Sequence, residues 1–176
     1  MSTPHPVSPS SEPLDDETLA FAERVFDCAR NGASEELHTL LAQGLPADLR
    51  NHKGDSLLML ASYHGHVDTT RLLLQHGATP DLRNNNGQTP LAGAAFKGDV
   101  AIIELLLEHG ADVEGSTPDG KTTLMLAAMF NRVEVVELLL AHGADAKRQD
   151  ASGLTALAAA QHMGAVQAVE RLRSAV

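Results

Sequence analysis

A glycine that returns every 33 residues is the feature that most constrains what this chain can fold into. The first series is Gly54, Gly87, Gly120 and Gly153. Two further series keep the same spacing: Gly44, Gly77, Gly110 and Gly143, then Gly32, Gly65, Gly98 and Gly164, with Asn131 in place of one glycine. A fixed period of this length indicates a repeat protein, in which each unit stacks on its neighbours.

The local signals within one repeat predict two short helices. Gly87 suits a turn that needs a positive φ, and the Thr89 side chain can accept a hydrogen bond from the first turn of a helix. This predicts a helix over roughly 90–96, which Gly98 ends. A second helix near 99–108 carries a broad apolar face.

Each repeat is therefore predicted to be a helix–turn–helix pair with one apolar side that it cannot bury alone. Stacking neighbouring pairs buries those sides in a continuous core. Aromatic residues make up only 3% of the chain, so small and aliphatic side chains must fill thin, closely packed layers. The predicted fold class is an all-α solenoid of stacked helix pairs connected by β-turns and loops.

The residues of these repeats resemble those of the ankyrin repeat family. Residues 87–91 read GQTPL, residues 105–112 read LLLEHGAD, and residues 138–145 nearly repeat the latter segment. Two repeats depart from the family pattern, with Ser56-Leu57 and Thr122-Thr123 in place of Thr-Pro. The resemblance covers nearly the whole chain and implies an ankyrin-repeat solenoid.

The repeat boundaries divide the chain into a tail and one repeat domain. We expect residues 1–16 to be a disordered, Ser/Pro-rich tail and residues 17–176 to be the ankyrin repeat domain. Its units are a divergent repeat 17–53, full repeats 54–86, 87–119 and 120–152, and a C-terminal capping repeat 153–176. Arg171 and Arg173 replace leucines of the full repeats, and such cations oppose the stacking of a further repeat.

Composition argues against several classes of function. The formal net charge of −10 is opposite to that of nucleic-acid binders and of proteins that dock on anionic membranes. No apolar run approaches the ~20 residues that span a bilayer, and the N-terminus lacks the features of a secretory signal. Cys28, the only cysteine, aligns with alanines and is expected to be buried and unreactive. We expect a cytoplasmic monomer that binds neither nucleic acid nor membrane.

The histidines and acidic residues are the candidates for metal or catalytic groups. One repeat position holds His76, His109 and His142. Equivalent positions in stacked helices lie ~10 Å apart, too far for one metal ion, so these side chains are expected to cap helices. A weak metal site formed by His64 and His66, with His52 nearby, remains an alternative. The turn carboxylates are expected to bond loop backbone, and no catalytic, cofactor or metal residue is assigned.

The resemblance implies that a partner binds through the turn tips and the inner helices, on the concave side. The residues assigned to this face are His52, Lys53, Asp55, Tyr63, His64, Asn85, Asn86, Gln88, Phe96, Lys97, Pro118, Asp119, Lys121, Met129 and Phe130. Three of the five aromatic residues, Tyr63, Phe96 and Phe130, fall here, and aromatic anchors are typical of binding hot spots. The alternative is that these rings pack as core.

The favoured function is a protein–protein interaction module, a scaffold or an inhibitor, with no enzymatic activity and no cofactor. Acidic outer helices and a mixed to basic concave side favour a partner with an acidic or mixed patch. One alternative is a secreted effector that acts on host proteins through the same surface. A more remote alternative is a small enzyme with a His/Asp site, which stacked short helices rarely provide.

Overall fold

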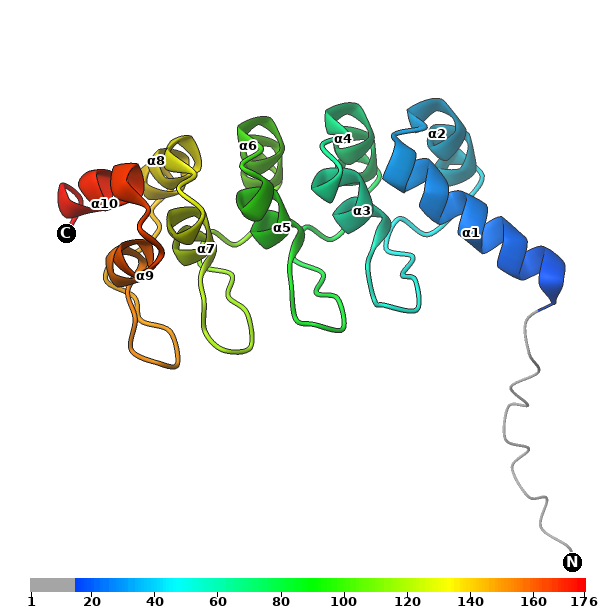
Figure 1. Cartoon of the computed structure of the whole chain (residues 1–176). Helices are drawn as coiled ribbons and strands as arrows, with labels where there is room; N and C mark the ends of the chain where they lie inside the picture. Colours follow the sequence, from blue (N-terminus) through cyan, green and yellow to red (C-terminus); the bar gives the residue numbers. More distant parts are fainter. Residues whose placement is uncertain (1–14) are drawn as a thin grey trace, which may run out of the picture.

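The computed structural model describes residues 15–176, in which ten α-helices alternate with turns and loops (Figure 1). The helices are α1 (Asp16–Asn31), α2 (Ser34–Ala42), α3 (Leu57–Tyr63), α4 (Val67–Gln75), α5 (Pro90–Lys97), α6 (Val100–Glu108), α7 (Thr123–Met129), α8 (Val133–Ala141), α9 (Ala156–Met163) and α10 (Val166–Arg173). None of these helices combines the length and apolar character that crossing a bilayer would need.

The helices form two layers that run the length of the molecule (Figure 1). Odd-numbered inner helices pack on one another, and even-numbered outer helices do the same. Four loops project together from the inner layer (Figure 1). We call them finger 1 (43–56), finger 2 (76–89), finger 3 (109–122) and finger 4 (142–155). The predicted all-α solenoid of stacked helix pairs is confirmed.

The inner helices α3, α5, α7 and α9 each begin after a serine or threonine at the same repeat position. The side chains of Thr89 and Thr122 accept hydrogen bonds of 3.2 Å from the backbone N–H groups three residues later. Ser56 and Thr155 do the same for α3 and α9. Such caps satisfy N–H groups that have no partner within the helix. Ser56-Leu57 and Thr122-Thr123, which replace the Thr-Pro pair of the family, therefore keep the capping hydroxyl although they lack the proline.

The core continues from one repeat into the next without interruption. On the outer layer, one position is buried in every repeat: Leu40, Leu73, Leu106, Leu139 and Leu172. On the inner layer, the corresponding small residues are Cys28, Ala61, Ala94, Ala127 and Ala160. The predicted burial of Cys28 is confirmed, and burial raises the pKa of its thiol. Small inner residues let the inner helices approach closely, while leucines fill the space between outer helices.

The first repeat differs most from its neighbours. Helix α1 is 16 residues long, whereas the other inner helices have seven or eight. It begins at Asp16, one residue before the expected start of the repeat domain, and Asp15 caps it by accepting a 2.7 Å bond from the Thr18 N–H. Residues 1–14 of the expected tail lie outside the described residues.

The last repeat is tied to its neighbour by polar side chains. Arg171, expected to oppose further stacking, pairs with Glu137 at 3.3 Å. Asn131 adopts a φ of 55° where other repeats have glycine. Its Oδ1 accepts a 3.0 Å hydrogen bond from the Ala168 N–H. Because Ala165 offers no side-chain cap for α10, the preceding repeat supplies one.

Replacing Thr70 by valine is expected to raise the free energy of unfolding by about 1 kcal/mol. Thr70 is fully buried, and its hydroxyl oxygen finds no hydrogen-bond partner within residues 15–176. Ile103 and Val136 hold the equivalent position, so an apolar side chain fits there. Urea denaturation followed by circular dichroism measures the change.

The adjacent Thr69 provides a matched control for this variant. Its hydroxyl lies 2.8 Å from the Ser34 hydroxyl, which links α2 to α4. Thr69→Val removes a satisfied group and is expected to give no gain. An equal gain from both variants would show that hydrophobicity alone, rather than the unpaired hydroxyl, sets the effect.

Candidate functional site

The main groove of the described residues lies on the concave face, by which we mean the fingers and the exposed side of the inner helices. It has a volume of about 690 Å³ and is bounded mainly by fingers 1 and 2 and by α3 and α5, and Thr117 of finger 3 and Leu126 of α7 also line it. Met59, Leu60, Ala92, Gly93 and Phe96 contribute its apolar surface. The size falls in the range of binding pockets.

Polar groups from the two fingers form the rim of this groove. Eight residues assigned from the sequence line it: His52, Lys53, Asp55, Tyr63, Asn85, Asn86, Gln88 and Phe96. Sequence reasoning missed several others, including Leu60, Asn84, Gly93 and Leu126. Leu60, Gly93 and Leu126 occupy one repeat position, so aligning the repeats provides the signal that could have found them.

The remaining assigned residues lie beside the groove rather than in it. His64 and Lys97 line a shallower hollow that shares Tyr63 with the groove. Pro118, Asp119 and Lys121 belong to finger 3, and Met129 and Phe130 lie at the end of α7. The assigned residues are thus spread along the concave face over three repeats, and only about half of them share one groove.

Tyr63, Phe96 and Phe130 form what we call the aromatic ridge, at the ends of α3, α5 and α7. They remain 38%, 40% and 38% exposed, so they are not core residues. The Phe96 and Phe130 rings meet edge to face with centroids 4.7 Å apart. The Lys97 ammonium lies 4.9 Å from the centroid of Tyr63. These contacts fix the orientation of the rings while leaving much of each ring open to solvent.

Two arginines brace the fingers from repeat to repeat. Arg50 donates a 2.6 Å hydrogen bond to the carbonyl of Arg83, one period later in the chain, and Arg83 donates to the carbonyl of Ser116 in the same way. Each also bonds the glycine carbonyl of its own finger, at Gly54 and Gly87. The basic character expected for this side is therefore partly structural, because these cations are held by backbone carbonyls.

A backbone hydrogen bond also joins neighbouring finger tips. The Asn85 N–H donates to the Lys53 carbonyl at 3.0 Å, and the Ala151 N–H donates to the Asp119 carbonyl at 3.0 Å. Between fingers 2 and 3 the corresponding donor would be Pro118, which has no N–H. Pro118 therefore removes this link from the middle of the finger row.

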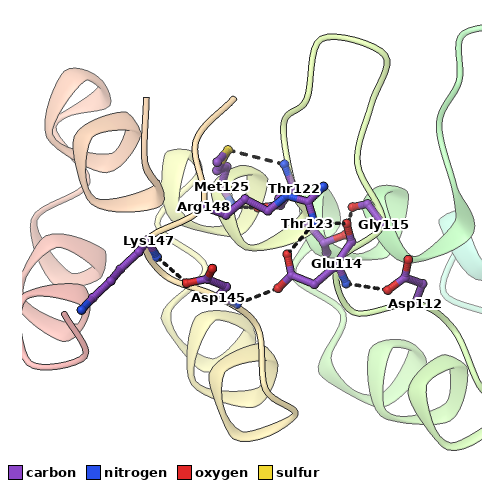
Figure 2. Close-up of polar contacts among 9 residues, drawn as sticks. All are labelled: Asp112, Glu114, Gly115, Thr122, Thr123, Met125, Asp145, Lys147 and Arg148. Carbon is purple, nitrogen blue, oxygen red and sulfur yellow. Dashed lines mark hydrogen bonds and ion pairs between the residues drawn. The ribbon is translucent and has the colours of Figure 1, made fainter. Parts of the chain in front are cut away.

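The carboxylates at the base of the fingers bind backbone of the next repeat. Asp48 accepts from the Thr79 N–H at 2.7 Å. Figure 2 shows the equivalent contact, in which Glu114 accepts from the Asp145 N–H at 2.6 Å and also pairs with Arg148 at 3.0 Å. The expectation that turn carboxylates bond loop backbone is confirmed, and these groups hold the fingers in register.

Charged residues of the assigned face differ in their surroundings. Lys121 bonds Asp119 within finger 3, which lowers the pKa of Asp119 and raises the pKa of Lys121. Asp55 accepts a 2.9 Å hydrogen bond from the Asn84 amide. Lys53, in contrast, is exposed and takes part in none of the ion pairs of residues 15–176.

The recurring histidines act at the ends of outer helices. The Nδ1 atoms of His109 and His142 each lie 2.9 Å from the carbonyl oxygen four residues earlier. This confirms the capping role expected for both. His76 differs, because its ring lies edge-on to His38 with centroids 5.7 Å apart.

The histidines near finger 1 have separate surroundings. The Nε2 atom of His66 lies 2.8 Å from the Arg30 carbonyl at the end of α1. The ring of His64 lies 6.4 Å away, and desolvation, followed by the charge of His66, lowers the pKa of His64. Across residues 15–176, no group of three or more His, Cys, Asp or Glu side chains is placed to hold a metal ion.

These features define a repeat protein built from stacked helix pairs, with polar fingers along one face. Comparison with family models gives two matches to ankyrin repeats, one covering residues 25–117 and one covering residues 99–160. The first alone spans more than half of the chain. The chain belongs to the ankyrin repeat family.

One similar curated relative is an ankyrin repeat protein of Pseudomonas aeruginosa. It is 66% identical over 65 residues, which make up 37% of this chain and 37% of the relative. The match therefore spans little more than a third of the relative's length. Ankyrin repeats are in general protein–protein interaction modules, and members of the family are typically not enzymes.

Proposed function

We propose that this chain is a cytoplasmic interaction module that binds one partner protein through its concave face, as a scaffold or an inhibitor. It acts as a monomer, carries out no catalysis and binds neither nucleic acid nor membrane. The observation that carries the proposal is the aromatic ridge, three rings held about two-fifths exposed beside an apolar groove.

Exposed aromatic rings on an otherwise well-packed solenoid are suited to recognition. A ring at an interface buries a large apolar area on binding and has few rotatable bonds to immobilise. The contact between Phe96 and Phe130 and the Lys97 cation above Tyr63 restrict these rings before a partner arrives. Such preorganisation lowers the entropic cost of association.

The fingers support the same proposal because they are rigidly held and polar at their tips. Arg50 and Arg83 connect successive fingers, and Glu114 fixes the base of the next. The exposed amides of Asn85 and Asn86 can donate and accept hydrogen bonds at the rim of the groove. A partner would thus meet an apolar floor with a polar rim, as is typical of interfaces.

The charge of the chain favours a protein partner with an acidic or mixed surface. A net charge of −10 disfavours nucleic acid and anionic lipid, since both repel an acidic surface. On the concave face, Lys53 and Lys97 remain exposed. Asp55 shares the groove lining with Lys53, and Asp99 and Glu134 line the hollow that holds Lys97, so the charge of this face is mixed. Complementary charge at these points would speed association and suppress wrong partners.

Phe96→Ala and Phe130→Ala are each expected to weaken partner binding by about 1 kcal/mol or more, because each removes a hot-spot ring. The intact chain is first used to capture the partner, which mass spectrometry identifies. Isothermal titration calorimetry with the purified partner then measures the loss. The fold is expected to remain, since both rings lie at the surface.

Val166→Ala is the matched control for the ring variants. Val166 is 65% exposed but lies on α10, in the outer layer of the last repeat. Its truncation should leave affinity unchanged. Normal binding by both phenylalanine variants would refute the assignment of the concave face.

A further inference from the structure

Gly93 interrupts the apolar row along the concave face. The equivalent positions hold Leu60 in α3 and Leu126 in α7, so the row reads leucine, glycine, leucine across three repeats. Gly93 lies within α5, where glycine is among the least favourable residues. Its φ is not positive, so the backbone does not require glycine at this position.

The missing side chain leaves a gap in the floor of the main groove. Gly93 lines the groove between Leu60 and Leu126, with Tyr63 and Phe96 of the aromatic ridge beside it. A Cβ atom added at Gly93 would lie 3.3 Å from Cδ2 of Tyr63, a tight contact that requires a small shift of this ring. The gap is thus flanked by aliphatic and aromatic side chains, which suit an apolar guest.

The rim of the groove adds polar selectivity to this gap. Lys53 is the lysine of the rim, and no carboxylate of residues 15–176 pairs with it. Asp55, the carboxylate of the rim, is already bonded by the Asn84 amide. Asp55 keeps its negative charge beside Asn84, whereas Lys53 is exposed, so its ammonium can pair with an acidic group on the guest. Exposed amides at Asn85 and Asn86 can bond the backbone of an extended chain.

We infer that the gap at Gly93 is a socket for one large apolar side chain of an extended peptide segment of the partner, with a neighbouring acidic residue of that peptide paired to Lys53. The inference rests on the proposed function and adds to it the chemistry of the recognised segment. The helix accepts an unfavourable glycine because a leucine there would fill the socket.

The experiment uses a phage-displayed library of random dodecapeptides selected on the intact, immobilised chain. We expect the selected peptides to share one large aliphatic or aromatic residue with an acidic residue within a few positions. A synthetic peptide of that consensus is then titrated by fluorescence anisotropy. Gly93→Leu is expected to weaken its binding at least tenfold, and replacing the apolar residue of the peptide by alanine should do the same.

Gln161→Leu is the control, because it places a leucine at an exposed position of the inner helix α9, outside the groove, whereas the equivalent residue Ala159 is buried and a leucine there would overpack the core. Its affinity for the peptide should stay within twofold of wild type. Lys53→Glu should weaken binding at low salt and reduce its dependence on ionic strength.

Gly93→Ala separates a binding role from a packing role and adds only a methyl group. If the glycine is there to keep the socket open, this variant raises Tm by about 3 °C, because alanine favours the helix, and it lowers the affinity for the peptide. If the glycine is needed to seat Tyr63, Tm falls, and the inference is overturned.

The remaining outcomes distinguish the inference from the proposal beneath it. Selected peptides that share no large apolar residue, or unchanged binding by Gly93→Leu, would overturn the socket. If Phe96→Ala still lowers the affinity for the same peptide in that case, the proposal that the concave face binds the partner stands without the socket. Unchanged binding by both variants would remove the socket and the proposed function together.

Discussion

Leu106→Ala is expected to lower the free energy of unfolding by about 3 kcal/mol. Leu106 is fully buried in α6, which packs against the outer helices on both sides and against α5. The substitution removes three buried carbons and leaves a cavity in the middle repeat, where stacking from both sides limits collapse. Because each repeat depends on its neighbours, the loss should affect the whole stack and lower the urea midpoint accordingly.

Leu107→Ala provides the control within the same helix. Leu107 is only half-buried, so its truncation removes less surface from the core. We expect a loss of about 1 kcal/mol, measured by the same urea titration. Equal losses from the two leucines would contradict the assignment of Leu106 to the shared core.

Gly54→Ala is expected to cost about 3 kcal/mol, from backbone strain and from a clash between fingers. Gly54 has a φ of +78°, and a Cβ there would lie 2.8 Å from the backbone nitrogen of Asn85. That nitrogen donates the hydrogen bond to the Lys53 carbonyl that joins fingers 1 and 2. The substitution therefore strains a turn and separates two fingers of the candidate site.

Gly77→Ala separates these two contributions. Its φ of +83° is nearly the same, but nothing lies within 4 Å of an added Cβ. It should therefore cost only the left-handed strain, about 1 kcal/mol. Thermal unfolding of both variants measures the difference, and equal losses would show that finger contact adds nothing to stability.

The fold followed from the sequence because its signals are local and repeated. Thr89 was expected to cap a helix and Gly98 to end it, and both do so in α5. Asp99, expected to begin the second helix, instead caps it at the Ile102 N–H. Errors of one residue at helix ends are ordinary, because the cap lies outside the helix that it stabilises.

Contacts between repeats were harder to foresee. The sequence predicts a mixed to basic concave side, to which Arg50 and Arg83 contribute, and their spacing of one period is that of the repeated glycines. Lys121, which the sequence assigns to the partner-binding face, bonds Asp119 in its own finger. The composition gives the number of charged residues. Which of them are free to bind a partner depends on the contacts that neighbouring fingers make in the folded chain.

The candidate site was only partly accessible to sequence reasoning. Tyr63, Phe96 and Phe130 could be assigned to the concave side from their repeat position, but their degree of exposure depends on side-chain packing. Gly93 could not be predicted as a site residue, because it lies in an Ala-rich helix and belongs to none of the repeated glycine series. The length of α1 could not be predicted either, because the first repeat diverges from the full repeats in sequence.

Hydrogen–deuterium exchange of the intact chain, with and without its captured partner, tests most directly where binding takes place. The proposed function requires that peptides covering residues 84–97 and 117–130 become protected, while α4, α6 and α8 exchange as before. Protection confined to those outer helices, with the aromatic ridge unchanged, would contradict it.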